Sequence, residues 1–144
     1  IKHVEERAAS DNTQTICSSD HADTLGAFNS RGKCKPHAPS VEVPLVFAGP
    51  GVKQGETSAL GEVVDIASTI LDFAGAEPLP ATDSKSLRPI LTGKTTVVRD
   101  HMTSGLKNWR AVTDGKYKLV VWDDAPTELY DLNKDPKELN NILL

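Results

Sequence analysis

Apolar residues recur at helical spacing near the start of the chain and in strand-like runs further on. A run of β-branched residues that begins at Thr13 predicts a strand, and it leads directly into Asp20-His21-Ala22-Asp23. Before it, Ser10-Asp11-Asn12 ends an expected helix. One face of that helix carries three apolar residues, Ile1, Val4 and Ala8. A helix, a turn and a strand in this order indicate an α/β unit.

The next segment, Thr24 to Glu42, is polar and irregular, and its glycines and prolines break any periodicity. A loop of this length in a compact domain is usually functional or disordered. Val41 to Ala48 then forms a strand-like run in which Pro44 limits backbone pairing. We expect this run to be a second strand of the sheet.

Two helices are predicted after this strand. Asp65 is a natural N-cap for a helix over 66–74, and Gly75 ends that helix. The run Ser86-Leu87-Arg88-Pro89-Ile90-Leu91 indicates a short second helix, which Gly93 ends. Both helices have an apolar face to bury.

Beyond Thr95 the pattern changes to alternating strands. The runs 109–113, 117–122 and 128–132 are rich in aromatic and β-branched residues, and Asp114-Gly115 between the first two is a strong hairpin signal. They predict an antiparallel meander. The alternation suggests that one face packs against a helix through Val112, Leu119, Val121 and Leu129. The chain is thus expected to divide into an α/β portion, residues 1–94, and an antiparallel-sheet α+β portion, residues 95–144.

Composition narrows the class of protein. The 144 residues include 38% hydrophobic and 25% charged side chains, a globular mixture, and the net charge of −4 argues against nucleic acid as a partner. No apolar run is long enough to span a membrane, and the N-terminus has neither a signal-peptide pattern nor an initiator Met. We therefore expect an internal piece of a longer protein. Cys17 and Cys34 can pair or remain free thiols, and spacing alone does not decide between these.

Asp20 and His21 are the first candidate for chemistry, because ligands collect beyond the ends of strands in α/β sheets. A carboxylate and an imidazole can hold a divalent cation. Neighbouring side chains on a strand point to opposite faces, so both can reach one ion only if the backbone turns here. The ordinary alternative is a turn with a solvated imidazole.

The order of several motifs resembles the later half of a sulfatase. The similarity begins with Thr13 to Gly26 and continues through Gly32-Lys33, Ser40 to Leu45 and Gly49-Pro50-Gly51-Val52. Further motifs follow at Val64 to Gly75, Ser86 to Leu91, Tyr117-Lys118-Leu119 and Glu128 to Leu132. No single motif is decisive, but the ordered series covers nearly the whole chain.

The resemblance implies the C-terminal part of an alkaline-phosphatase-like sulfatase fold, followed by a small antiparallel-sheet subdomain. It implies hydrolysis of a sulfate ester by an enzyme with one divalent cation, usually calcium, with Asp20 and His21 as metal ligands. Because an imidazole suits manganese or zinc better than calcium, manganese, magnesium or zinc remain alternatives. Lys33 matches a lysine that contacts the sulfate, where its ammonium would neutralise charge on the leaving oxygen. Relatives of this kind are commonly periplasmic or extracellular.

The nucleophile of the family is a formylglycine made from Cys in a Cys-X-Pro-X-Arg motif. Cys34-Lys35-Pro36 has the right start, but Ala38 stands where Arg is required. We therefore expect the formylglycine only in a missing upstream half, which would be a partner of this chain. Relatives also usually have a His where this chain has Phe28, so assistance to the leaving group is lost there. His37 could replace it if the loop folds back, although a surface His is the ordinary expectation.

Three interpretations follow. The first is the C-terminal portion of a sulfatase. The second is a hydrolase of phosphate or phosphonate esters from the same superfamily, and the third is a degenerate, non-catalytic chain, which Phe28 and Ala38 favour.

Overall fold

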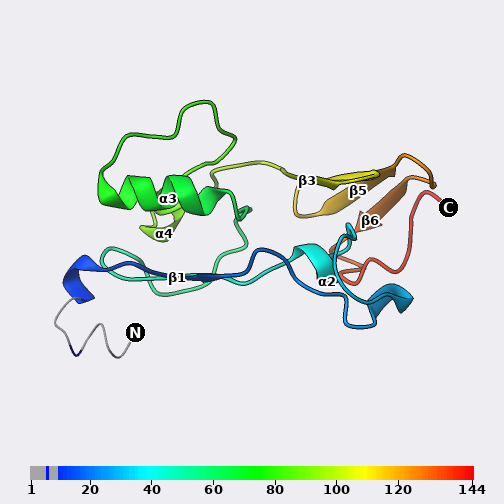
Figure 1. Cartoon of the computed structure of the whole chain (residues 1–144), viewed down its shortest axis with the longest axis horizontal. Helices are drawn as coiled ribbons and strands as arrows, with labels where there is room; N and C mark the ends of the chain where they lie inside the picture. The colour runs from blue at the N-terminus through cyan, green and yellow to red at the C-terminus, as the bar shows by residue number, and fades with distance from the viewer. Residues whose placement is uncertain (1–5, 7–9) are drawn as a thin grey trace. The chain divides into compact units, whose positions relative to one another are not determined.

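The structure is a computed structural model that describes residue 6 and residues 10–144, in two compact units (Figure 1). The first unit contains the described residues up to 19 together with residues 44–99, and the second contains residues 20–43 and 100–144. The helix expected from Ile1, Val4 and Ala8 lies outside the described residues. The expected division into 1–94 and 95–144 follows the change of sequence pattern near Thr95 rather than compactness, and it stays a prediction.

A two-stranded antiparallel ribbon forms the base of the first unit. Strand β1 (Thr15–Ser18) pairs with β2 (Leu45–Ala48), and Thr15 lies opposite Ala48. A short 3-10 helix, η1 (Ser10–Asn12), precedes β1. At the end of β2 the backbone passes so close to β1 that a Cβ at Gly49 would lie 2.6 Å from the carbonyl oxygen of Thr13, so only glycine fits there.

The second predicted strand is shorter than expected. Residues Ala38–Val41 form a helical turn, α2, with Pro39 in its first turn, and the Glu42 amide donates to the Ala38 carbonyl at 2.9 Å. Proline is accepted at this place because the first amides of a helix have no partner inside the helix. The expectation that the strand begins at Val41 is therefore wrong.

Two helices lie on one face of the β1–β2 ribbon, as Figure 1 shows. Helix α3 (Asp65–Ala74) and helix α4 (Arg88–Leu91) agree with the predicted helices. The predicted end of α3 is confirmed, because Gly75 adopts a left-handed conformation with φ 64° and the Ala76 amide donates to the Leu71 carbonyl.

The start of α3 is built differently from the expected N-cap. Asp65 is the first helical residue, fully buried, and its carboxylate accepts hydrogen bonds from the amides of Glu62 and Lys85, each at 2.8 Å. The guanidinium of Arg99, which is 7% exposed, pairs with the same carboxylate. One carboxylate thus joins three separate segments of the first unit.

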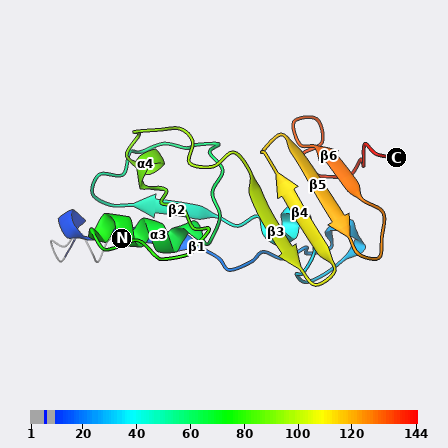
Figure 2. The same cartoon turned by 90° about the horizontal axis from the view of Figure 1, so that it is seen from above.

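A four-stranded antiparallel sheet forms the second unit, with its strands in chain order (Figure 2). The strands are β3 (Met102–Leu106), β4 (Trp109–Thr113), β5 (Tyr117–Trp122) and β6 (Glu128–Asp131). The predicted meander is confirmed over β4 to β6, and the Asp114 carboxylate closes the hairpin by accepting the amides of Lys116 and Tyr117. Strand β3 was not predicted.

The buried face of this sheet is the opposite of the expected one. Trp109, Val120 and Tyr130 are at most 5% exposed, whereas Val112 and Val121 are 37% and 45% exposed. Lys118 is also buried on the Val120 face, because its ammonium pairs with the buried carboxylate of Glu138 at 2.8 Å. The expectation that Val112, Leu119, Val121 and Leu129 pack against a helix is therefore not met by the described residues.

Among residues 6 and 10–144, no helix combines the length and apolar character that crossing a bilayer requires.

Candidate functional site

The candidate metal ligands lie on a folded loop that begins directly after β1. Asp23 shapes this loop, because its carboxylate accepts the amide of Leu25 at 2.8 Å and that of Gly32 at 3.2 Å. The Thr24 amide and hydroxyl both donate to the Gly32 carbonyl. These bonds fold the loop back on itself and bring residue 33 beside residue 21.

Asp20, His21 and Lys33 come together at the base of this loop. Lys33 Nζ lies 2.6 Å from His21 Nε2, and Asp20 Oδ2 lies 3.6 Å from the same nitrogen. The three side chains therefore share one small region on one side of the second unit. Their roles toward a metal ion or a sulfate stay predictions.

The tautomer that the neutral His21 ring adopts follows from its two neighbours. Its Nδ1 lies 2.9 Å from the Ala22 carbonyl oxygen, which can only accept a hydrogen bond, so Nδ1 carries the proton. The Lys33 ammonium can only donate, so Nε2 is the acceptor. The neutral ring thus directs its one lone pair at Lys33.

Asp20 is an ionised, solvated carboxylate. When His21 is protonated, its charge lowers the pKa of Asp20 below its usual value of 3.8, and the His21 amide and Lys33 act in the same direction. The side chain of Asp20 is 86% exposed and that of His21 is 41% exposed. Both donors can therefore be reached from solvent.

These two donors fit part of a metal site. Two ligands of one ion, each bound at about 2.0–2.6 Å, lie roughly 3–4 Å apart, which matches the separation of Asp20 Oδ2 and His21 Nε2. A calcium ion takes about six to eight oxygen ligands. Among residues 6 and 10–144, no cluster of three or more His, Cys, Asp and Glu side chains is arranged to hold a metal ion. The chain thus offers a half-site.

The Cys34-Lys35-Pro36 segment has a structural role. Cys34 is a half-buried free thiol, and its carbonyl oxygen accepts the indole N–H of Trp109 at 3.1 Å. Ala38, at the position of the missing arginine, is held by its amide, which donates to the Glu138 carboxylate at 3.3 Å. The segment ties the loop to the sheet.

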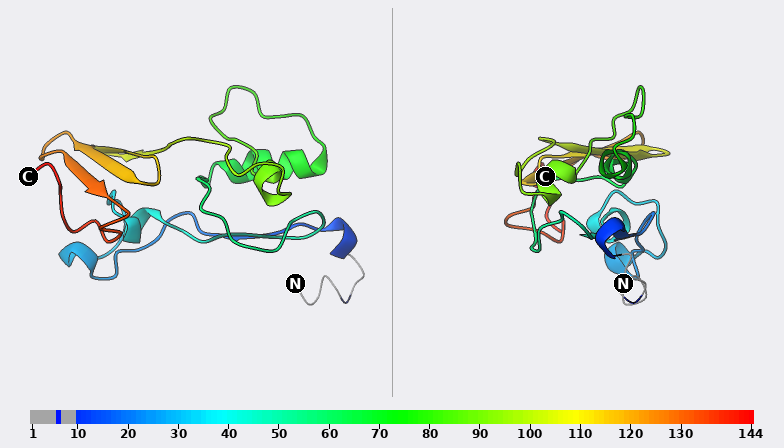
Figure 3. Two further views of the ribbon diagram at one scale, coloured as in Figure 1. Left: turned by 180° about the vertical axis from the view of Figure 1, so that it is seen from behind. Right: turned by 90° about the vertical axis from the view of Figure 1, so that its left-hand side faces the viewer.

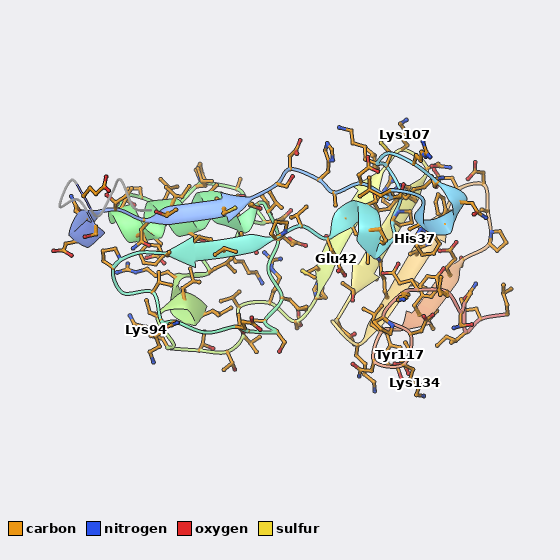
Figure 4. All side chains as sticks on the ribbon, turned by 90° about the horizontal axis from the view of Figure 1, so that it is seen from below. His37, Glu42, Lys94, Lys107, Tyr117 and Lys134 are labelled. Atoms are coloured by element: carbon orange, nitrogen blue, oxygen red, sulfur yellow. The ribbon has the colours of Figure 1, made fainter. Side chains whose placement is uncertain are left out.

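His37 is buried rather than on the surface, which corrects the ordinary expectation for this residue. Its Nε2 lies 3.2 Å from Glu128 Oε2, and its ring stacks on Phe28 with 4.1 Å between the ring centroids. Figure 4 labels His37 beside the α2 turn. The loop thus folds back far enough to bring His37 against Phe28, and a replacement of the leaving-group histidine by His37 stays a prediction.

Sequence reasoning missed the acidic residues that hold the loop. Glu128 also accepts hydrogen bonds from Trp122 Nε1 and from the Tyr130 hydroxyl, and burial together with Glu128 raises the pKa of Tyr130. Glu138 joins Lys118 to the Ala38 amide. Figure 3 shows the 20–43 segment on one face of the sheet. These partners lie 91 and 100 residues from His37 and Ala38, so no local pattern indicates them.

Comparison with protein families gives a match over most of the chain. The family described as "N-sulphoglucosamine sulphohydrolase, C-terminal" matches residues 26–144. The choline-sulfatase of Rhizobium meliloti is 32% identical over 139 residues, which cover 92% of this chain and 27% of that protein. The extracellular sulfatase SULF-1 homolog of Drosophila melanogaster is 33% identical over 68% of this chain and 9% of its own length.

Solved structures agree with this match. The structure of BT4656 in complex with its substrate D-glucosamine-2-N,6-O-disulfate has a TM-score of 0.87 and 26% identity, covering 99% of this chain and 32% of that one. The phosphonate monoester hydrolase of Silicibacter pomeroyi has a TM-score of 0.85 and 28% identity, covering 99% and 33%. This chain spans about a third or less of each of these proteins. It has the fold of the C-terminal part of the sulfatases of the alkaline phosphatase superfamily, and it belongs to the sulfatase family.

Proposed function

We propose that this chain is the C-terminal portion of a metal-dependent enzyme that hydrolyses sulfate esters. Asp20 and His21 serve as two ligands of one divalent cation, with calcium as the first choice and manganese, magnesium or zinc as alternatives. Lys33 contacts the sulfate. The observation that carries the proposal is the convergence of these three side chains, with Lys33 Nζ 2.6 Å from His21 Nε2.

The chemistry of these groups suits a sulfate ester. When bound, the cation would offset the negative charge of the sulfate oxygens. The Lys33 ammonium would donate hydrogen bonds to the sulfate and stabilise the charge that develops on the leaving oxygen. The exposure of Asp20 supports access of an anionic substrate from solvent.

The formylglycine nucleophile would come from another part of the complete protein. Ala38 leaves the Cys34 segment without the arginine of the formylglycine motif. We therefore place the formylglycine in an upstream part that forms one active site with this half-site. By analogy with the extracellular relative, we propose a periplasmic or extracellular location.

A phosphonate monoester hydrolase is the second candidate. It is favoured by the phosphonate monoester hydrolase structure, whose TM-score of 0.85 is close to that of the sulfate-binding neighbour. The two activities would use the same half-site, since sulfate and phosphonate esters both present anionic oxygens to a cation and a lysine.

The test uses the protein expressed from the complete reading frame that encodes this chain. We expect 4-nitrophenyl sulfate to be turned over with a higher kcat/KM than 4-nitrophenyl phenylphosphonate, and EDTA to abolish turnover until calcium or manganese is restored. Lys33→Ala should lower kcat by about 10²–10³-fold, the usual loss for one stabilising donor. Lys35→Ala is the matched control and should leave kcat unchanged. A higher kcat/KM on the phosphonate ester would favour the second candidate, and full activity of Asp20→Ala would overturn the proposed ligand set.

A further inference from the structure

We propose that Lys33 is a latch on the metal half-site: its ammonium occupies the His21 lone pair that a cation would use, so that cation binding releases Lys33 toward the sulfate. This inference rests on the proposed function and adds an order of events to it. In the metal-free chain the lysine is held by the imidazole, and in the loaded site it becomes available to the anion.

The latch follows from counting donors and acceptors on one ring. Nδ1 of His21 donates to the Ala22 carbonyl, so Nε2 is the only ring nitrogen with a lone pair. Lys33 Nζ donates to this nitrogen at 2.6 Å. A metal ion needs the same lone pair, because a neutral imidazole binds metals through its unprotonated nitrogen. Lys33 and the cation therefore exclude one another at His21.

The loop keeps the released lysine close to the site. The Gly32 amide and carbonyl are held by Asp23 and Thr24, which fixes the backbone next to Lys33. The ammonium sits on a flexible four-carbon stem, so it can leave the ring while its Cα stays in place. Repulsion between the cation and the ammonium drives the lysine away from His21, and an anion placed beside the cation attracts it.

The same geometry decides how many donors of the Lys33 ammonium an anion can use. Without a cation, the Lys33 ammonium is engaged with His21 at 2.6 Å. One of its three N–H donors is then directed at His21 instead of at an anion. With a cation on the His21 lone pair, all three N–H donors of Lys33 would be available to an anion beside that cation.

The first experiment examines the metal-free 144-residue chain. Long-range 1H–15N NMR at pH 7.5 reports the tautomer of each histidine ring, and the His21→Gln variant assigns the His21 signals. We expect His21 in the Nδ1–H tautomer, with the Nε2 resonance moving downfield in Lys33→Met, which removes the donor and keeps the apolar stem. Lys35→Met should leave it in place. An Nε2 resonance that does not respond to Lys33→Met overturns the latch.

The second experiment measures Mn²⁺ uptake by the protein expressed from the complete reading frame, from the EPR signal of the free ion. Lys33→Met should bind Mn²⁺ about fivefold more tightly than the unmodified chain, and Lys35→Met within about twofold, because an exposed charge alone has a small effect. In the His21→Gln background, Lys33→Met should change the Kd by less than about twofold, since the contested lone pair is gone.

The outcomes separate the latch from the proposed function. Mn²⁺ binding that Asp20→Ala weakens, with no gain from Lys33→Met, overturns the latch and leaves the metal site standing. An equal gain from Lys33→Met with and without His21 also overturns it, because the effect is then one of charge alone. Mn²⁺ binding that Asp20→Ala does not weaken, or no binding at all, overturns the proposed ligands and the latch together.

Discussion

Among single residues, His37 shows how the second unit holds an imidazole in its neutral form. Burial lowers the pKa of His37, and Lys118 acts in the same direction, whereas Glu128 and Glu138 oppose this shift. The ring donates from Nε2 to Glu128, and its Nδ1 is buried with no hydrogen-bond partner among the described residues. Protonation of His37 would add a positive charge to its buried contact with Glu128.

A pH dependence of stability follows. The pKa of His37 is lower in the folded chain than its usual value of 6.5, so the unfolded chain takes up this proton first as the pH falls. The free energy of unfolding should therefore decrease below about pH 6.5 until the folded pKa is reached. Urea unfolding at pH 7.5, 6.5 and 5.5 measures this change. His37→Gln should flatten it, and His101→Gln, at an exposed site, should not; equal slopes in the two variants would contradict the assignment.

The sequence predicted which residues form the candidate site, but it predicted only some of the contacts between them. Asp20, His21 and Lys33 could be named because they match family motifs in the sequence. The 2.6 Å contact between Lys33 and His21 could not, because it depends on loop bonds that Asp23 makes to backbone amides. Side-chain-to-backbone bonds of this kind have only weak sequence signatures.

Among elements, helix α3 depends on the buried carboxylate at its start. Asp65 is fully buried and pairs with Arg99, which itself is 7% exposed. Arg99 also pairs with Glu62 at 3.0 Å, so the loss of the Asp65 charge still leaves Arg99 one carboxylate partner. An asparagine at position 65, however, has one acceptor oxygen where the carboxylate accepts the amides of Glu62 and Lys85 through two. We expect Asp65→Asn to lower the free energy of unfolding in urea titrations by about 1–3 kcal/mol, the cost of a buried donor left without its acceptor.

Asp72 provides the matched control on the same helix. Its carboxylate pairs with Arg88 at 2.8 Å, but the side chain is 36% exposed. Hydrogen bonds from Ser86 and Arg88 lower the pKa of Asp72, yet solvent screening limits the contribution of such a pair to below about 1 kcal/mol. Equal losses for Asp65→Asn and Asp72→Asn would contradict the role assigned to the buried carboxylate.

Elements with strong periodicity were predicted, and the errors have physical causes. Strand β3 was missed because Thr103-Ser104-Gly105 carries no apolar alternation, and it forms by pairing with β4. The sheet face was assigned to the wrong side because Val112 and Val121 are more apolar than Lys118. A buried lysine satisfied by Glu138, 20 residues away, reverses the face that alternation predicts.

For the whole molecule, we predict that the isolated 144-residue chain does not turn over aryl sulfates. It has two candidate metal ligands, and its Cys34 segment lacks the arginine of the nucleophile motif. Losing both the nucleophile and most of the metal coordination removes many orders of magnitude in rate. The measurement is 4-nitrophenyl sulfate turnover by the purified chain with added calcium, magnesium or manganese. Turnover that Cys34→Ala abolishes would instead make Cys34 a nucleophile.

The second unit is built from two stretches that lie far apart in the sequence, 20–43 and 100–144, and this affects the order in which it can fold. The loop that carries Asp20, His21 and Lys33 is held to the sheet through Cys34–Trp109, His37–Glu128 and Ala38–Glu138, contacts that join residues 75 to 100 positions apart. At a synthesis rate of about 5–20 residues per second, the last of these partners leaves the ribosome roughly 5–20 s after the loop. A stop codon before Glu138 would spare every candidate site residue and still remove the carboxylate that holds Ala38 and Lys118.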